Sequence, residues 1–146
     1  MGKTCFFIGH RYEDVDCDRL AEEIERHIVE YGVDTFVIGH YGFFDLMATH
    51  YVAEAKKKHS HVKLYRLLPY LPKEGGSEPP ESYDGTIYMD GIEKVPYRFA
   101  IVQSNRRMVD RSDYLITNAW QPGSNSLKVV EYARKKGNIG ITRLND

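Results

Sequence analysis

Short apolar runs alternate with stretches of helical periodicity along almost the whole chain. Three of these runs, residues 4–8, 35–38 and 114–117, are directly followed by a turn that contains glycine. Each run is short enough for a strand buried on both faces, and a helix-compatible stretch follows each turn. The alternation predicts an α/β fold, namely a Rossmann-like open sheet, mostly parallel, of about five strands with helices on both faces.

Helices are expected where apolar residues recur every three or four positions. The first should run from a cap at Asp14 or Asp16 to about Tyr31. Further helices are expected over residues 43–58, 97–110 and 126–136, and Gly137 should end the last of them. In the second helix we expect Leu46 on the inner face.

The middle of the chain carries weaker signals. We expect a strand over residues 61–71 and the last strand over residues 139–142. Residues 73–83 are rich in Gly, Pro, Glu and Ser, which predicts a loop. Residues 86–96 surround an Asp-Gly pair and fit either a small hairpin or an irregular excursion. The chain, residues 1–146, is therefore expected to be a single domain with a hairpin or loop excursion at about 73–96.

The length and the net charge of the chain exclude several classes of protein. The 146 residues suffice for one domain with a proper core, and the formal net charge of -1 argues against duplex nucleic acid as a partner, since that usually requires a basic face. No apolar run approaches the length of a membrane span, and the N-terminus lacks a signal pattern. Two cysteines do not make a disulfide framework. We expect a cytoplasmic protein without a membrane partner.

The turn after the first run contains Gly9, His10 and Arg11. In an open parallel sheet, the loops beyond the carboxyl ends of the strands build the ligand crevice. Gly9 would let the backbone approach a ligand, and the Arg11 guanidinium matches a phosphate or a carboxylate. His10 is a candidate hydrogen-bond donor or acid–base group. Alternatively, Arg11 pairs with the acidic residues that follow it.

The turn after the second run contains Gly39, Tyr41 and Gly42, and Asp45 falls in the first turn of the helix that follows. Two glycines three residues apart before a helix favour a nest of backbone N–H groups that suits an anion. Asp45 is a candidate to hold a ribose hydroxyl or to act as a base. A carboxylate at this position often only caps its helix.

The third candidate region combines the end of one helix with the turn after residues 114–117. Asn105 and Arg106 are candidate ligand-binding residues, although neighbouring helical residues point to different sides. Trp120 could stack on a base or pack at the rim. The small polar residues of the turn, which can cap a helix and bind phosphate oxygens, are Gly123, Ser124, Asn125 and Ser126.

The sequence lacks the motifs of several other kinds of functional site. The sequence has no phosphate loop of the Gly-x-x-x-x-Gly-Lys-Ser/Thr type, no zinc spacing of Cys and His, and no Gly-x-Ser-x-Gly elbow. We therefore expect no metal and no cofactor. The turns together indicate an anionic, nucleotide-like small molecule as the partner.

The order of these motifs resembles the SLOG superfamily, the small Rossmann-like group of the Lonely-Guy phosphoribohydrolases and the DprA-type domains, and within it the YpsA-like branch. The resemblance spans nearly the whole chain. It is carried by Cys5–Arg11, Gly39–Asp45, Leu67–Tyr70, Asn105–Asp113, Gly123 and Ala133–Gly137. It implies ligands such as nucleoside monophosphates or ADP-ribose-like molecules, held by a sensor or sequestering protein, and a homodimer or a higher homo-oligomer.

The hydrolases of that family carry a Pro-Gly-Gly-x-Gly-Thr-x-x-Glu run whose glutamate helps to cleave an N-glycosidic bond. The corresponding stretch here runs from Pro122 to Val130, so the glutamate is missing and the nearest acid is Glu131. The resemblance thus favours binding. The alternative is an N-glycosidase, a phosphoribohydrolase or deoxyribosyltransferase-like enzyme, that would use Asp45, Glu131 or His10 instead.

Overall fold

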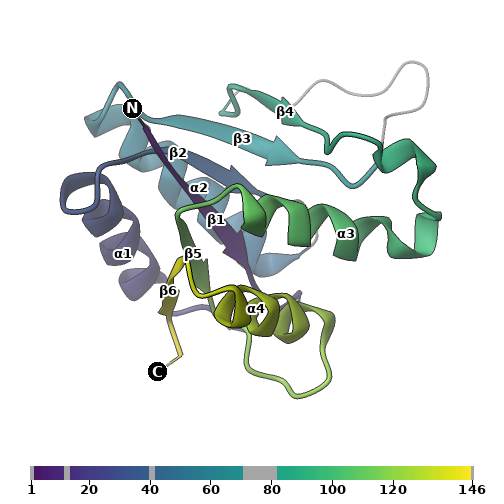
Figure 1. Cartoon of the computed structure of the whole chain (residues 1–146). Helices are drawn as coiled ribbons and strands as arrows, with labels where there is room; N and C mark the ends of the chain where they lie inside the picture. Colours follow the sequence, from purple (N-terminus) through teal and green to yellow (C-terminus); the bar gives the residue numbers. More distant parts are fainter. Residues whose placement is uncertain (1, 12–13, 40–41, 71–81, 146) are drawn as a thin grey trace.

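A parallel sheet forms the centre of the molecule (Figure 1). The computed structural model describes residues 2–11, 14–39, 42–70 and 82–145. Within them, six strands lie in the order β4-β3-β2-β1-β5-β6, and each neighbouring pair is parallel. The strands are β1 (Lys3–Ile8), β2 (Val33–Ile38), β3 (Lys63–Leu67), β4 (Gly85–Ile87), β5 (Tyr114–Thr117) and β6 (Gly140–Arg143).

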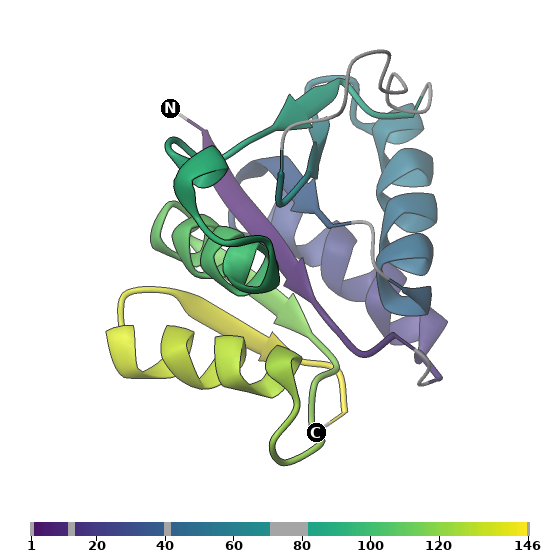
Figure 2. The same cartoon turned by 90° about the vertical axis from the view of Figure 1, so that its right-hand side faces the viewer.

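Helices cover both faces of the sheet (Figures 1 and 2). Helices α1 and α2 pack on one face, whose core includes Phe7, Phe36 and Phe44. Helices α3 and α4 pack on the other face around Phe6 and Leu115. The helices are α1 (Cys17–Val29), α2 (Phe43–Lys58), α3 (Tyr97–Asp110) and α4 (Asn125–Lys136), with a short 3₁₀ helix at Ile92–Lys94. The expected fold class, a Rossmann-like open sheet with helices on both faces, is confirmed.

The chain changes direction across the sheet at β1. From β1 it moves outward through β2, β3 and β4, and then returns to the other side of β1 to form β5 and β6. The connections after β1 and β5 therefore diverge to opposite faces, which opens a crevice at the carboxyl ends of these strands. The first and third glycine turns of the sequence lie at these two ends.

Local signals fix where the helices begin and end. The Asp16 side chain accepts a hydrogen bond from the Arg19 N–H (3.1 Å) and caps α1, as expected. The Ser124 hydroxyl accepts from the Leu127 N–H (3.1 Å) and caps α4. Gly137 ends α4 in the left-handed region with φ of 76°, a conformation that favours glycine.

Three expectations differ from the structure. Strand β3 is shorter than the expected 61–71, whose last residue lies outside the described residues, because only residues 63–67 pair with β2 or β4. The sheet has a sixth strand, β4, which pairs with β3 in parallel, so this segment is not one arm of a hairpin. Leu46 is exposed rather than internal, since Phe44 and Ala48 face the core from the same stretch of α2.

His27 on α1 is a buried histidine far from the glycine turns. Its Nδ1 lies 2.6 Å from the carbonyl oxygen of Glu23, so Nδ1 carries the proton of the neutral ring. Its Nε2 is buried and has no hydrogen-bond partner among the described residues. The ring meets Tyr31 and Tyr114 edge-on, with centroids 4.9 and 5.4 Å apart. Burial lowers the pKa of His27, opposed by the hydrogen bond to Glu23.

We expect the stability of the protein to fall as the pH drops below about 6.5, the ordinary pKa of histidine. The unfolded chain takes up a proton at His27 in this range while the folded protein does not, so protonation favours unfolding. Urea unfolding between pH 7.5 and 5 would measure the slope. His27→Phe should flatten it, and an unchanged slope in that variant would contradict the assignment.

Candidate functional site

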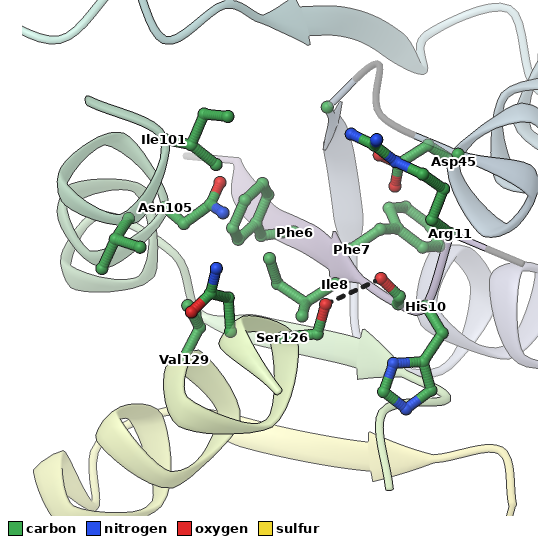
Figure 3. Close-up of a pocket in the computed structure, with 15 residues that line it drawn as sticks. Phe6, Phe7, Ile8, His10, Arg11, Asp45, Ile101, Asn105, Ser126 and Val129 are labelled. Carbon is green, nitrogen blue, oxygen red and sulfur yellow. Dashed lines mark hydrogen bonds between the residues drawn. The ribbon is translucent and has the colours of Figure 1, made fainter. Parts of the chain in front are cut away.

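A cavity of about 180 Å³ lies at the carboxyl end of β1, where the chain changes direction (Figure 3). Its walls come from β1, the turns after β1 and β2, the first turn of α2, the middle of α3 and the first turns of α4. The candidate residues from the sequence that line it are Gly9, His10, Arg11, Gly39, Gly42, Asp45, Asn105, Asn125 and Ser126. Residues from all three predicted regions are therefore brought together.

Gly9 and Gly42 allow the turns to approach each other closely. A Cβ atom on Gly9 would lie 2.2 Å from two ring atoms of Phe44 and 2.5 Å from Oδ1 of Asn118. A Cβ atom on Gly42 would lie 2.4 Å from Cα of Arg11. Both glycines are needed because no space exists for a side chain, and not because of their backbone angles.

The N-terminus of α2 opens onto the cavity without a side-chain cap. Gly42 occupies the cap position and offers no side-chain hydrogen bond to the helix. The Phe43 N–H donates to the carbonyl oxygen of Arg11 (2.9 Å), which joins the first and second turns. The 16-residue helix α2 adds the positive end of its dipole at this point. Such an end favours an anionic group.

Arg11 and Asp45 lie next to each other on the α2 side of the cavity (Figure 3). The guanidinium supplies a fixed positive charge and a planar set of donors. Asp45 supplies a carboxylate in the first turn of α2. This side of the cavity can therefore bind an anion through Arg11 and the backbone, and a hydroxyl group through Asp45.

The α4 side of the cavity is uncharged and polar. The Ser126 hydroxyl donates to the carbonyl oxygen of Gly9 (2.9 Å), which fixes α4 against the end of β1 (Figure 3). Asn125 and Asn105 bring side-chain amides from α4 and α3 to the same cavity. Amides both donate and accept hydrogen bonds, as recognition of a base or a sugar requires.

His10 is held by the loop after β5. Its backbone N–H donates to Oδ1 of Asn118 (3.0 Å). Its Nε2 accepts from the backbone N–H groups of Trp120 (2.8 Å) and Gln121 (3.2 Å). Because these are donors, Nε2 carries no proton. In Figure 3 the ring points away from Asn105 and Asp45. The geometry fits a side chain that positions the loop better than an acid or a base.

His10→Phe should lower the free energy of unfolding by about 1–3 kcal/mol, because two partly buried backbone donors lose their acceptor. Chemical denaturation measures this change. Trp120 fluorescence should shift to the red as the loop loosens. A variant as stable as the wild type, with unchanged fluorescence, would show that the loop does not depend on the ring.

Several candidate residues lie outside the cavity lining. Arg106 turns toward α4, with its guanidinium carbon 5.5 Å from the ring centroid of Tyr132. Trp120 is half exposed and meets the His10 ring edge-on at 5.9 Å. Gly123 has a φ of 80° in the turn, and Ser124 is used as the cap of α4. Tyr41 lies outside the described residues.

Of the three candidates for catalysis, Asp45 is the carboxylate that lines the cavity. Glu131 is exposed on α4 and does not line it. Val130, at the place where the resemblance predicts a glutamate in hydrolases, is fully buried in the core. The helix therefore turns this position away from the cavity.

The sequence analysis did not predict the apolar part of the cavity. Phe6, Phe7 and Ile8 of β1 form its base, and Ile101, Val102 and Val129 contribute side chains from the two helices. Helical spacing could have indicated Ile101 and Val129, because residues four positions apart lie on the same face of a helix. Ile101 precedes Asn105 by four positions, and Val129 follows Asn125 by four.

The described residues contain no cluster of three or more His, Cys, Asp or Glu side chains suited to a metal ion. Among the helices in the described ranges, none is both long and apolar enough to cross a bilayer.

No family model matches this chain, and no curated protein matches it in sequence. Among solved structures, it is similar to DNA processing protein A (DprA) from Streptococcus pneumoniae, with a TM-score of 0.65 and 16% identity over 96% of this chain. It is also similar to the Chlamydomonas rheinhardtii Moco carrier protein, with a TM-score of 0.52 and 14% identity over 97% of this chain. The chain spans about half (49%) of the DprA chain and 76% of the carrier chain. At these identities the likeness concerns the fold alone, which is the Rossmann-like open sheet that the sequence pattern predicted.

Proposed function

We propose that this protein binds an anionic, nucleotide-derived small molecule in the cavity at the end of β1, as a sensor or a sequestering protein. The observation that carries the proposal is the meeting of an uncapped α2 N-terminus, the Arg11 guanidinium and closely packed glycine turns around one cavity. The helix N-terminus and the guanidinium favour negative charge, the glycines allow the turns to pack closely, and the position is where open α/β sheets bind ligands.

The remaining walls favour a ligand with a sugar or a base attached to its anionic group. Asn105, Asn125 and Ser126 offer hydrogen bonds, while Ile101 and Val129 offer apolar contact. The volume of about 180 Å³ is smaller than the roughly 300 Å³ at which typical ligand sites begin. We therefore expect part of the ligand to extend beyond this cavity.

Binding without turnover is favoured over hydrolysis. The buried Val130 offers no carboxylate where family hydrolases have one, and one of the structural neighbours is named a carrier protein. The alternative, an N-glycosidase, depends on Asp45, the candidate carboxylate that lines the cavity. We also propose that the protein belongs to the YpsA-like branch and acts in the cytoplasm as a homodimer; the branch and the dimer are what the resemblance of its motifs implies.

Incubation of the purified protein with AMP, NAD, ADP-ribose and cyclic ADP-ribose isomers, followed by chromatography, tests the proposal. We expect one class of nucleotide to stay bound through gel filtration and to be released intact on denaturation. Free base with a ribose phosphate would support the N-glycosidase instead, and Asp45→Asn should then abolish its release. Retention of no nucleotide by the protein would contradict the proposal.

A further inference from the structure

Arg66 is a buried charge that the cavity described above does not include. It lies near the end of β3 and retains only 7% of its exposure. Among the described residues, its Nε is buried without a hydrogen-bond partner and Arg66 forms no ion pair with any carboxylate. A guanidinium does not lose its proton in a protein. A buried charge without a partner strongly destabilises the folded state, so its presence requires a reason.

A second unsatisfied polar atom lies beside Arg66. Thr86 of β4 is its register partner in the parallel ladder, so both side chains project from the same face of the sheet. The Thr86 hydroxyl oxygen is also buried and has no hydrogen-bond partner in the part of the chain that the structure describes. A cation and a hydroxyl donor with unused hydrogen bonds thus occupy neighbouring strands.

This pair lies near the cavity at the end of β1. The buried Tyr83 hydroxyl forms a 2.7 Å hydrogen bond with Thr49 of α2, whose hydroxyl in turn donates to the Asp45 carbonyl oxygen (2.8 Å). Arg66 and Asp45 both act electrostatically on Tyr83. Burial raises the pKa of Tyr83, so its phenol is neutral at pH 7 and does not compensate the guanidinium.

We propose that Arg66 and the Thr86 hydroxyl bind an anionic group, a phosphate or a carboxylate, at the ends of β3 and β4. The existence of this anion site does not depend on the proposed function. Only the claim that the bound anion is part of the molecule in the cavity rests on the proposed function. A ligand with two separated anionic groups would then reach from Arg11 to Arg66. Such a length agrees with a cavity too small for a whole nucleotide.

The test compares the wild type with Arg66→Met and, as a control, Arg106→Met, which removes an arginine that packs over Tyr132 outside the cavity. In phosphate-free buffer, Arg66→Met should raise Tm by about 3 °C or more, because an apolar side chain replaces an uncompensated charge. Inorganic phosphate at constant ionic strength should raise the Tm of the wild type and of Arg106→Met. The phosphate-induced rise should be at least halved in Arg66→Met.

A wild-type response to phosphate in Arg66→Met would overturn the proposal, whatever the nucleotide panel gives. A Tm of Arg66→Met below that of the wild type would also overturn the proposal, because it would assign Arg66 a structural role. Arg66→Gln, which keeps a polar side chain, checks that result independently. If a nucleotide binds, its Kd should rise at least tenfold in Arg66→Met. If no nucleotide binds but the phosphate response still depends on Arg66, the proposed function fails and the anion site stands.

Discussion

Gly9→Ala should lower the free energy of unfolding by about 3 kcal/mol or more, the upper range for overpacking a core. The added methyl group would meet the buried Phe44 ring at 2.2 Å and the Asn118 Oδ1 atom at 2.5 Å. Phe44 is packed in the core and Asn118 accepts the His10 N–H, so neither is free to move. Because Gly9 itself lines the cavity, ligand binding should be lost with the stability. Urea denaturation and the nucleotide panel measure the two effects.

Gly2→Ala is the matched control for this prediction. Its Cβ would also come within 2.1 Å of a neighbour, but that neighbour is the carboxylate of Asp34, the end of a flexible side chain. The same chemical change should therefore cost less than about 0.5 kcal/mol. Equal losses in the two variants would mean that the clash at Gly9 relaxes as easily as one at the surface.

Arg11→Met should raise the Kd for the bound nucleotide about 10- to 100-fold, which corresponds to the loss of about 1.5–3 kcal/mol from a charged hydrogen bond. Asp45→Asn removes a negative charge from the same side of the cavity, so affinity for an anion such as inorganic phosphate should not fall. Calorimetric titration of both variants with the nucleotide and with inorganic phosphate measures the two affinities.

The two variants also serve as controls for each other. If Arg11 and Asp45 only form a structural pair, both substitutions should lower the stability and neither should act selectively on binding. A weaker phosphate affinity in Asp45→Asn equal to that in Arg11→Met would show that the pair acts as a unit and that Arg11 does not contact the anion.

Much of the fold follows from local patterns. The bounds of α2 and α3 agree with helical periodicity, and α4 begins within one residue of its expected start. Strand β4 could not be predicted in this way. It has three residues, all half-buried, so neither an apolar run nor a strict alternation marks it. Its place at the edge of the sheet is set by pairing with β3.

The position of the candidate site could be predicted from the sequence, but the roles of some of its residues could not. The order of strands brings the glycine turns together, and that order follows from general rules for parallel sheets. The role of His10 depends on the backbone of Trp120, which is 110 residues away in the sequence. Asn105 faces the cavity while Arg106 faces Tyr132, a difference of one helical position. Arg66 stands in an apolar run, yet its burial depends on how α2 and Tyr83 pack around β3.

A crystal structure of the protein with tungstate, an anion that resembles phosphate and scatters strongly, tests the central claim most directly. The account predicts anomalous density in the cavity, beside Arg11 and the N-terminus of α2. A second peak beside Arg66 and Thr86 would extend the site as proposed. Tungstate bound only at the protein surface, with the cavity at the end of β1 empty, would contradict the claim that this cavity binds an anionic ligand.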